Sequence, residues 1–268
     1  MKKIPIAPIF IPANRLDFCD KAIKSGADGL IIDLEDSVKE DQKEEALLAL
    51  VKYLETSSLE VPIFVRVNSL KLEQGKKDLK ALEGVRSKYE NIIVPKVDDP
   101  SFLDLVSSDS PVIALIESAL AVRNLEQICS LDVVDGVLLG AADLSKSLGS
   151  DMSWDSLLHT RSKMIIEAAA LNLMLIDSPF MNMTDMEGLK EEVRKLKAMG
   201  FVSKAAIHPD QINVIKKGLL PNKEEIEEAK VIIEAYEKSS GGVISVNGKM
   251  VDAPIVEAMK KRLSMIQE

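Results

Sequence analysis

The sequence predicts an α/β protein, a (β/α)₈ TIM barrel followed by a C-terminal arm of one hairpin and one helix. Eight short runs rich in Val, Ile and Leu recur, and segments with helical spacing of apolar residues separate them. The length of 268 residues suits one such barrel. A doubly wound sheet would have a glycine-rich turn after the first run, but this turn reads Pro12-Ala13-Asn14-Arg15.

The apolar runs are nearly continuous and do not alternate with polar residues. This pattern is typical of parallel strands that are buried on both faces. The predicted strands are residues 6–13, 29–36, 62–68, 91–97, 111–118, 135–144, 173–180 and 201–209.

Between the strands, apolar residues recur at the spacing of one helix face. The fifth and sixth helices are expected to be short or partly loop. The clearest predicted helices are residues 17–24, 39–54, 70–88, 154–171 and 183–199.

The C-terminal region is predicted to form a separate arm. A charged helix starts at Pro221 and runs to about Lys238, and residues 239–242 form a flexible joint. Asn247-Gly248 is a hairpin signal, and residues 253–265 are predicted as an amphipathic helix. We expect residues 1–238 to form the barrel with the catalytic mouth, and residues 239–268 to complete the site of a neighbouring subunit.

Composition excludes several classes of function. The net charge of −9 argues against nucleic acid as a partner, because phosphate contacts need clustered Lys and Arg. No apolar run is long enough to cross a membrane, and prolines interrupt the first 13 residues, which argues against a signal peptide. Cys19 and Cys129 have no disulfide or metal spacing, which fits a cytoplasmic protein.

Charged residues follow most of the predicted strands, at the end where barrel enzymes have their active sites. We expect their side chains to point into one mouth. These residues are Asp33, Glu35 and Asp36 after the second strand, Arg66 after the third, Lys96, Glu117 and Asp143 after the next three, and Asp177 after the seventh.

Carboxylates that converge in this way repel one another unless a cation binds between them. Oxygen ligands favour Mg²⁺, which takes one or two carboxylates and completes its shell with water and substrate. We predict Glu117 and Asp143 as the direct ligands, because they are single acids at the ends of adjacent strands. An acid placed directly after the apolar Val112–Ile116 is either paired or functional.

The other mouth residues have more than one interpretation. Arg66 offers a planar fork to a carboxylate or an enolate, or forms an ion pair with an acid of the second strand. Asp36 is either a site residue or the N-cap of the helix that starts near Lys39. A Schiff base on Lys96 is disfavoured, because nearby carboxylates keep its ammonium charged. His208 either positions a ligand or makes a structural hydrogen bond.

Seven motifs together resemble the citrate lyase beta-subunit-like family, within the wider aldolase and citrate lyase superfamily that includes malyl-CoA lyases. They occur in the same order over nearly the whole chain. The motifs are FIPANR (10–15), DLEDSV (33–38), VRVN (65–68), VPK (94–96), IESA (116–119), LGAADL (139–144) and IHPDQ (207–211).

The resemblance implies a Mg²⁺-dependent carbon–carbon lyase. Its substrate would be a hydroxyacyl thioester such as citramalyl-, malyl- or citryl-CoA, cleaved to, or formed from, a 2-oxo acid and an acyl-CoA. Glu117 and Asp143 would bind the metal and Arg66 the oxo acid or enolate. Glu35 and Asp36 would orient metal-bound water, and Arg15 would lie near the phosphates of the thioester carrier.

The resemblance also implies an oligomer, a homotrimer or hexamer. In CoA-using relatives an aspartate of the adjacent subunit's C-terminal region is the general base, and Asp252 in KMVDAP (249–254) resembles it. Two departures, Ala121 and Ser203-Lys204 in place of more usual glycines, concern the fit of the substrate.

Two alternatives stay open from the sequence. A pyruvate-type class II aldolase would act on free aldehydes, and residues 140–149 also resemble that branch, although Arg15 and Asp252 argue against it. A non-catalytic subunit would bind a partner or an acyl carrier protein, but such a scaffold has no physical need for converging carboxylates. The sequence leaves open the acyl group, the carrier, and whether thioester hydrolysis follows.

Overall fold

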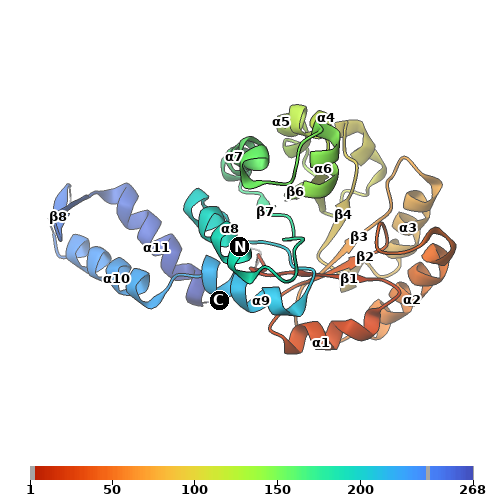
Figure 1. Ribbon diagram of the computed structural model, residues 1–268, viewed down its shortest axis with the longest axis horizontal. Helices are drawn as coiled ribbons and strands as arrows, with labels where there is room; N and C mark the ends of the chain where they lie inside the picture. Colours follow the sequence, from red (N-terminus) through yellow and green to blue (C-terminus); the bar gives the residue numbers. More distant parts are fainter. Residues whose placement is uncertain (1–3, 240–241, 268) are drawn as a thin grey trace.

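The structure, a computed structural model that describes residues 4–239 and 242–267, is built on a parallel sheet of seven strands (Figure 1). Neighbouring strands in the sheet are also neighbours in the chain, as βα alternation requires. The strands are β1 (Ile9–Pro12), β2 (Leu30–Asp33), β3 (Ile63–Arg66), β4 (Asn91–Val94), β5 (Val112–Ile116), β6 (Val134–Leu139) and β7 (Met174–Ile176).

Helices follow the strands and pack on the outer face of the sheet. Short 3₁₀ turns η1 (Leu16–Phe18), η2 (Glu40–Gln42), η3 (Arg86–Lys88) and η4 (Pro100–Leu105) join them. The helices are α1 (Cys19–Lys24), α2 (Lys43–Thr56), α3 (Glu73–Glu83), α4 (Ala119–Arg123), α5 (Leu125–Cys129), α6 (Ala141–Leu148), α7 (Trp154–Leu171), α8 (Met186–Met199) and α9 (Pro209–Leu219).

The sheet is curled, because alternate residues of its strands meet in one inner apolar cluster. Ile31, Phe64, Ile93 and Leu138 belong to this cluster, and so does Ala205 from the segment after α8. The intervening residues face the helices and form the larger outer core. The predicted α/β class and the parallel sheet are therefore confirmed.

The predicted eighth strand, residues 201–209, is not a regular strand. It makes only two isolated parallel bridges, between Asp177 and Lys204 and between Ile9 and Ala206. Pro8 explains part of the interruption: Lys204 N donates to Ile6 O at 3.0 Å, but the return bond of a parallel ladder would need an N–H on Pro8, and proline has none. The segment thus lies between the ends of β7 and β1 without forming a full ladder with either.

The C-terminal region folds as the predicted hairpin and helix. It comprises α10 (Lys223–Glu237), β8 (Ile244–Val246), β9 (Lys249–Val251) and α11 (Ala253–Gln267). Ile232, Val251 and Val256 form the centre of a small apolar cluster of its own. Figure 1 shows this arm extending away from the sheet, beyond α8 and α9. Among the described helices, none combines the length and apolar character needed to span a bilayer.

Candidate active site

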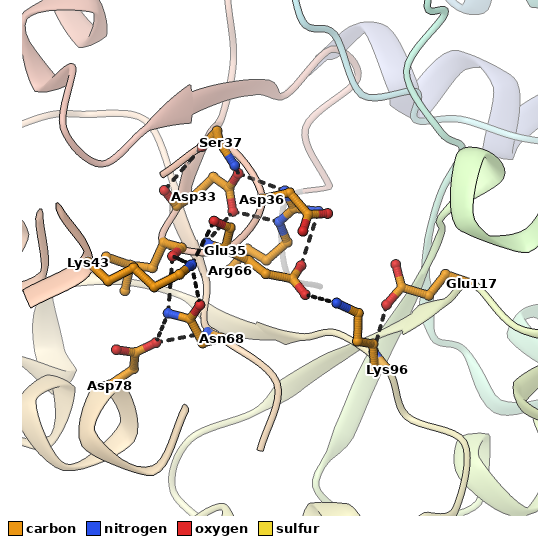
Figure 2. A network of polar contacts seen from close by, with 11 residues as sticks. Asp33, Glu35, Asp36, Ser37, Lys43, Arg66, Asn68, Asp78, Lys96 and Glu117 are labelled. Carbon is orange, nitrogen blue, oxygen red and sulfur yellow. Dashed lines mark hydrogen bonds and ion pairs between the residues drawn. The ribbon is translucent and has the colours of Figure 1, made fainter. Parts of the chain in front are cut away.

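Charged side chains from four consecutive strands meet at the carboxyl end of the sheet (Figure 2). Glu35 follows β2, Arg66 is the last residue of β3, Lys96 follows β4 and Glu117 follows β5. The strand registers bring these positions side by side, since Asp33 pairs with Arg66 in the ladder. The predicted convergence of these four residues is confirmed.

Arg66 forms a forked ion pair with Asp33. Its Nε and Nη2 lie 2.6 Å from the two carboxylate oxygens; the Asp33 side chain is buried and that of Arg66 is 13% exposed. Burial opposes ionisation of Asp33, but the guanidinium outweighs it, so the pKa of Asp33 lies below its usual value. The third nitrogen, Nη1, is left to face Glu35 at 3.5 Å. Arg66 therefore forms the predicted ion pair with an acid of the second strand. Its Nη1 is still directed at the mouth.

The Asp33 carboxylate also fixes the turn that carries the next acid. Its Oδ1 accepts from the backbone N–H of Glu35 at 2.9 Å, and its Oδ2 accepts from that of Ser37 at 3.1 Å. This is the local turn that Asp side chains form with backbone two residues ahead. Glu35 is thereby turned toward the mouth.

Glu35 and Lys96 form an ion pair across the mouth. Lys96 Nζ lies 2.9 Å from Glu35 Oε1, and the Glu35 side chain is buried. Burial raises the pKa of Glu35, although Arg66 and Lys96 oppose that rise. Lys96 has a φ of 57°, in the left-handed region that non-glycine residues rarely adopt. In this conformation its backbone N–H donates to Glu117 Oε1 at 2.7 Å while its side chain reaches Glu35.

Glu117 is a buried acid of the site with a strongly raised pKa. It is 5% exposed, and burial, together with the negative charge of Glu35, raises its pKa to about 8. The charge of Asp143, in the first turn of α6, adds to this rise. A buried acid facing two other acids is typical of functional sites.

Gly140 leaves the space that Glu117 occupies. A Cβ on residue 140 would lie 2.5 Å from Glu117 Cβ and 3.0 Å from its Oε2, closer than atoms can approach. Sequence reasoning missed this requirement. The only signal was a glycine at the end of a strand, next to one that ends in an acid.

The site fits a divalent cation that is held partly by substrate or water. Among residues 4–239 and 242–267, no three Asp, Glu, His or Cys side chains could hold an ion by themselves. Mg²⁺ does not need three, because it commonly uses one or two carboxylates. Glu117, directly after β5, and Asp143, in the first turn of α6, provide two. Burial and then the neighbouring acids raise the pKa of Glu117, and a bound cation would offset both effects.

Three other predicted site residues lie at the edge of this cluster or outside it. Arg15 is exposed, pairs with Asp17 at 2.9 Å and stacks 3.6 Å from the Phe18 ring centroid. Asp36 is exposed at the rim, 4.0 Å from Arg66 Nη1. It is not an N-cap, because α2 begins only at Lys43.

Asp252 is the third of these residues. It follows β9, and its Oδ1 accepts from Ile255 N at 3.3 Å at the start of α11. The paired strand β8 lies at the far end of the arm from the sheet in Figure 1. Asp252 is therefore not part of the mouth of its own chain.

The expectation that Asp177 faces the mouth is wrong. Because Ile176 points into the inner cluster, the next side chain points outward, between the sheet and the helices. There Asp177 is fully buried and lies 2.8 Å from both Arg161 Nε and Lys204 Nζ. His208 has the structural role: its Nδ1 accepts from Asp210 N at the start of α9.

Known proteins match this chain over most of its length. The family model described as HpcH/HpaI aldolase/citrate lyase matches residues 7–209. A citrate lyase subunit beta-like protein of Mycobacterium tuberculosis is 33% identical over 265 residues, 95% of this chain and 94% of that protein. A (3S)-malyl-CoA thioesterase of Cereibacter sphaeroides is 34% identical, covering 91% and 88%. Human mitochondrial citramalyl-CoA lyase is 29% identical, covering 97% and 84%.

Solved structures are also similar to this chain, one of them over its whole length. M. tuberculosis CitE in complex with magnesium, acetoacetate and coenzyme A matches with a TM-score of 0.87 and 31% identity, covering 100% of both chains. The citrate lyase beta subunit of M. tuberculosis with oxaloacetate and magnesium matches at 0.71 and 32% identity, covering 81% of this chain and 98% of that one.

Proposed function

This chain belongs to the HpcH/HpaI aldolase/citrate lyase family, and on that basis we propose that it is a Mg²⁺-dependent carbon–carbon lyase. Its substrate would be a hydroxyacyl thioester such as malyl-, citramalyl- or citryl-CoA, split into a 2-oxo acid and an acyl-CoA or formed from them. The observation that carries the proposal is the buried Glu117 carboxylate, which faces Glu35 and the charge of Asp143 beside an arginine and a lysine.

In this proposal Glu117 and Asp143 hold the metal. Bound Mg²⁺ would act as a Lewis acid on the carboxylate and carbonyl of the oxo acid. Arg66 Nη1, which the Asp33 ion pair leaves free to face the mouth, would bind the oxo acid or the charge that develops on a substrate oxygen. Glu35 and Asp36 would orient water in the mouth.

The reaction needs one proton removed and one supplied. Removal of the substrate's hydroxyl proton lets the carbon–carbon bond break. The oxo acid then carries a new carbonyl, and the carbon next to the thioester takes up a proton. Asp252 is the proposed general base. Since Asp252 lies on the arm, the proposal requires a neighbouring subunit, with a homotrimer or hexamer as the assembly and residues 239–268 as the donated part.

The names of the relatives support coenzyme A as the thioester carrier. Those named a citramalyl-CoA lyase and a malyl-CoA thioesterase act on CoA esters, and the similar CitE structure binds coenzyme A. Arg15, exposed at the end of β1, is the proposed contact for CoA phosphates. The thioesterase relative also favours a second candidate activity, hydrolysis of the thioester after condensation.

Two structural features complete the proposal. Residues 201–209 would take the place of the eighth strand of the barrel. Their bridges to Asp177 and to Ile9 support this. A cytoplasmic setting is supported by two buried free thiols, Cys19 and Cys129.

The test is a panel of CoA esters with Mg²⁺ or with EDTA. Malyl-, citramalyl- and citryl-CoA would release glyoxylate, pyruvate and oxaloacetate, while a free-thiol assay would report hydrolysis. We expect one ester to be cleaved with Mg²⁺ and none with EDTA. Cleavage that persists in EDTA, or turnover of free hydroxy-oxo acids without CoA, would favour a different mechanism or the class II aldolase alternative.

A further inference from the structure

Lys43 is a buried cation in the position of a core residue. The inward face of α2 carries Ala46, Leu47, Leu50 and Leu54, and Lys43 continues the same stripe one turn earlier. Its residue is only 9% exposed. An apolar side chain would pack here without the cost of burying a charge, so the lysine must serve its polar contacts.

The Lys43 ammonium uses all three of its N–H donors. It donates to Leu34 O at 3.1 Å, to Glu35 O at 2.9 Å and to Asn68 Oδ1 at 2.6 Å (Figure 2). Two of these acceptors are consecutive backbone carbonyls of the segment that follows β2. The contacts of Lys43 are thus aimed at backbone of the mouth, and not at a carboxylate partner.

A second layer holds the lysine in place. Asn68 Nδ2 donates to Leu34 O at 3.0 Å and to Asp78 Oδ2 at 2.7 Å, while Asn68 N donates to the same Asp78 oxygen at 2.8 Å. Asp78 belongs to α3, so the network links α2, α3 and the ends of β2 and β3. Asp78 balances the charge of Lys43 through Asn68.

Glu35 is consequently fixed at both ends of its backbone by buried side chains. Asp33 accepts from its N–H at 2.9 Å, and Lys43 donates to its C=O at 2.9 Å. With both peptide groups fixed, the direction of the Glu35 side chain toward Lys96 and Arg66 is set before any substrate arrives. We propose that Lys43 is a positioning residue, which acts on catalysis through the backbone of Glu35.

The consequence for catalysis rests on the proposed function, in which Glu35 orients water at the metal. Partners of this kind typically change metal affinity or activity by about 10- to 100-fold when they are lost. Lys43→Met keeps the length of the side chain and removes its charge and donors. Lys52→Met, on the exposed side of the same helix, is the matched control.

The first experiment is hydrogen exchange on the metal-free full-length chain. Lys43→Met should increase exchange of the Glu35 amide by about 10-fold or more, with wild-type circular dichroism, while Lys52→Met should not. This measurement needs no substrate, so it tests the positioning even if every CoA ester in the panel is inert. Unchanged protection of Glu35 in a folded Lys43→Met protein would overturn the inference.

The second experiment is a double-mutant cycle with Glu35→Gln, read as kcat, KM for the CoA ester and Mg²⁺ affinity by calorimetry. Lys43→Met should lower kcat and Mg²⁺ affinity by about 10-fold or more, with little change in KM, and should add little in the Glu35→Gln background. Full additivity would overturn the inference, because Lys43 would then act independently of Glu35. If wild type shows no Mg²⁺-dependent turnover while the exchange result holds, only the proposed function fails.

Discussion

The guanidinium of Arg66 binds the carboxylate of Asp33 through two hydrogen bonds of 2.6 Å, from Nε and Nη2. The same ion pair closes the turn after β2, because Asp33 accepts from the backbone of Glu35 and Ser37. One structural pair therefore orients both Arg66 Nη1 and the Glu35 carboxylate at the mouth.

Arg66→Lys should reduce activity strongly while leaving a folded protein. Lysine offers a point charge and cannot both bind Asp33 through a fork and present a third nitrogen to substrate. We expect kcat/KM to fall by about 100-fold and the free energy of unfolding by about 1–3 kcal/mol. Steady-state kinetics and urea unfolding measure the two effects. Arg194→Lys, on the exposed side of α8, is the control, and equal losses in both variants would contradict the role of the fork.

Glu117→Gln should abolish Mg²⁺ binding and turnover without unfolding the chain. The pKa of Glu117 is raised to about 8 from 4.5, so the metal-free protein holds this side chain neutral at neutral pH, as Gln is. A group whose pKa is higher in the folded chain than in the unfolded chain contributes stability that is fully present below its unfolded pKa. This stability is lost as the pH rises through the folded pKa. In EDTA, wild type should thus lose stability relative to Glu117→Gln between pH 4.5 and about 8. Full turnover by the variant in chelated buffer would refute the assignment.

Gly140→Ala should displace Glu117 and weaken the metal site. The added Cβ would meet Glu117 Cβ at 2.5 Å, a distance that such atoms do not adopt, so the acid must move away. We expect Mg²⁺ affinity to fall by about 10-fold or more, measured by calorimetry. Gly84→Ala is the matched control, because its Cβ would have its nearest contact at 3.9 Å. Wild-type affinity in Gly140→Ala would show that Glu117 is not held in this position.

Asp177→Asn should destabilise the chain and change its acid unfolding. Burial opposes the charge of Asp177, but Lys204 and Arg161 outweigh it and lower its pKa. Stability from this group is therefore present above its unfolded pKa of about 3.9 and is lost as pH falls through the lower folded value. At pH 7 the variant leaves the buried cations Arg161 and Lys204 to share the carboxylate of Glu192, which should cost about 3–5 kcal/mol in urea unfolding.

Urea unfolding at a series of pH values distinguishes loss of the Asp177 charge from a general loss of stability. Stability of Asp177→Asn should fall less steeply below pH 4 than that of wild type. Asp155→Asn, where the side chain is exposed, is the control for the same type of substitution. Parallel pH curves for Asp177→Asn and wild type would show that the group does not titrate as its contacts imply.

Asp252→Asn should be inactive alone and should complement Glu117→Gln. If the arm completes a neighbour's mouth, a mixed assembly contains sites with Glu117 from one chain and Asp252 from the next. Random pairing of equal amounts should restore activity at about a quarter of sites. The measurement is the activity of the co-refolded or co-expressed mixture, with each variant alone as control. No recovery in a mixed oligomer that sedimentation shows to have formed would exclude a shared site.

The site residues at the carboxyl ends of the early strands were predictable from two rules. Strand periodicity gives the direction of each side chain, and the active sites of barrel enzymes lie at the carboxyl ends of the strands. Glu35, Arg66, Lys96 and Glu117 follow apolar runs directly, so their meeting required only the parallel register. Asp177 followed a run in the same way but was placed wrongly. A side chain points to the opposite face if the strand register shifts by one residue. The sequence does not determine at which residue the strand ends.

Other features depended on contacts between distant segments. Lys43 has a sequence signal only in hindsight, as a charge on an apolar helical stripe, and nothing local indicates which carbonyls it binds. The need for glycine at position 140 exists only because Glu117 of the neighbouring strand fills the space beside it.

The sequence by itself determined the α/β class, the order of strands, the arm and the set of acids and bases available at one end of the sheet. Hydrophobic period and chain order are local properties, so they can be read along the chain. Only the tertiary structure decided that Asp33 claims two nitrogens of Arg66, that Asp177 faces the helices, and that Pro8 interrupts the eighth ladder. Each of these depends on which atoms of distant segments come within hydrogen-bonding distance, and that distance is set by packing of the whole molecule.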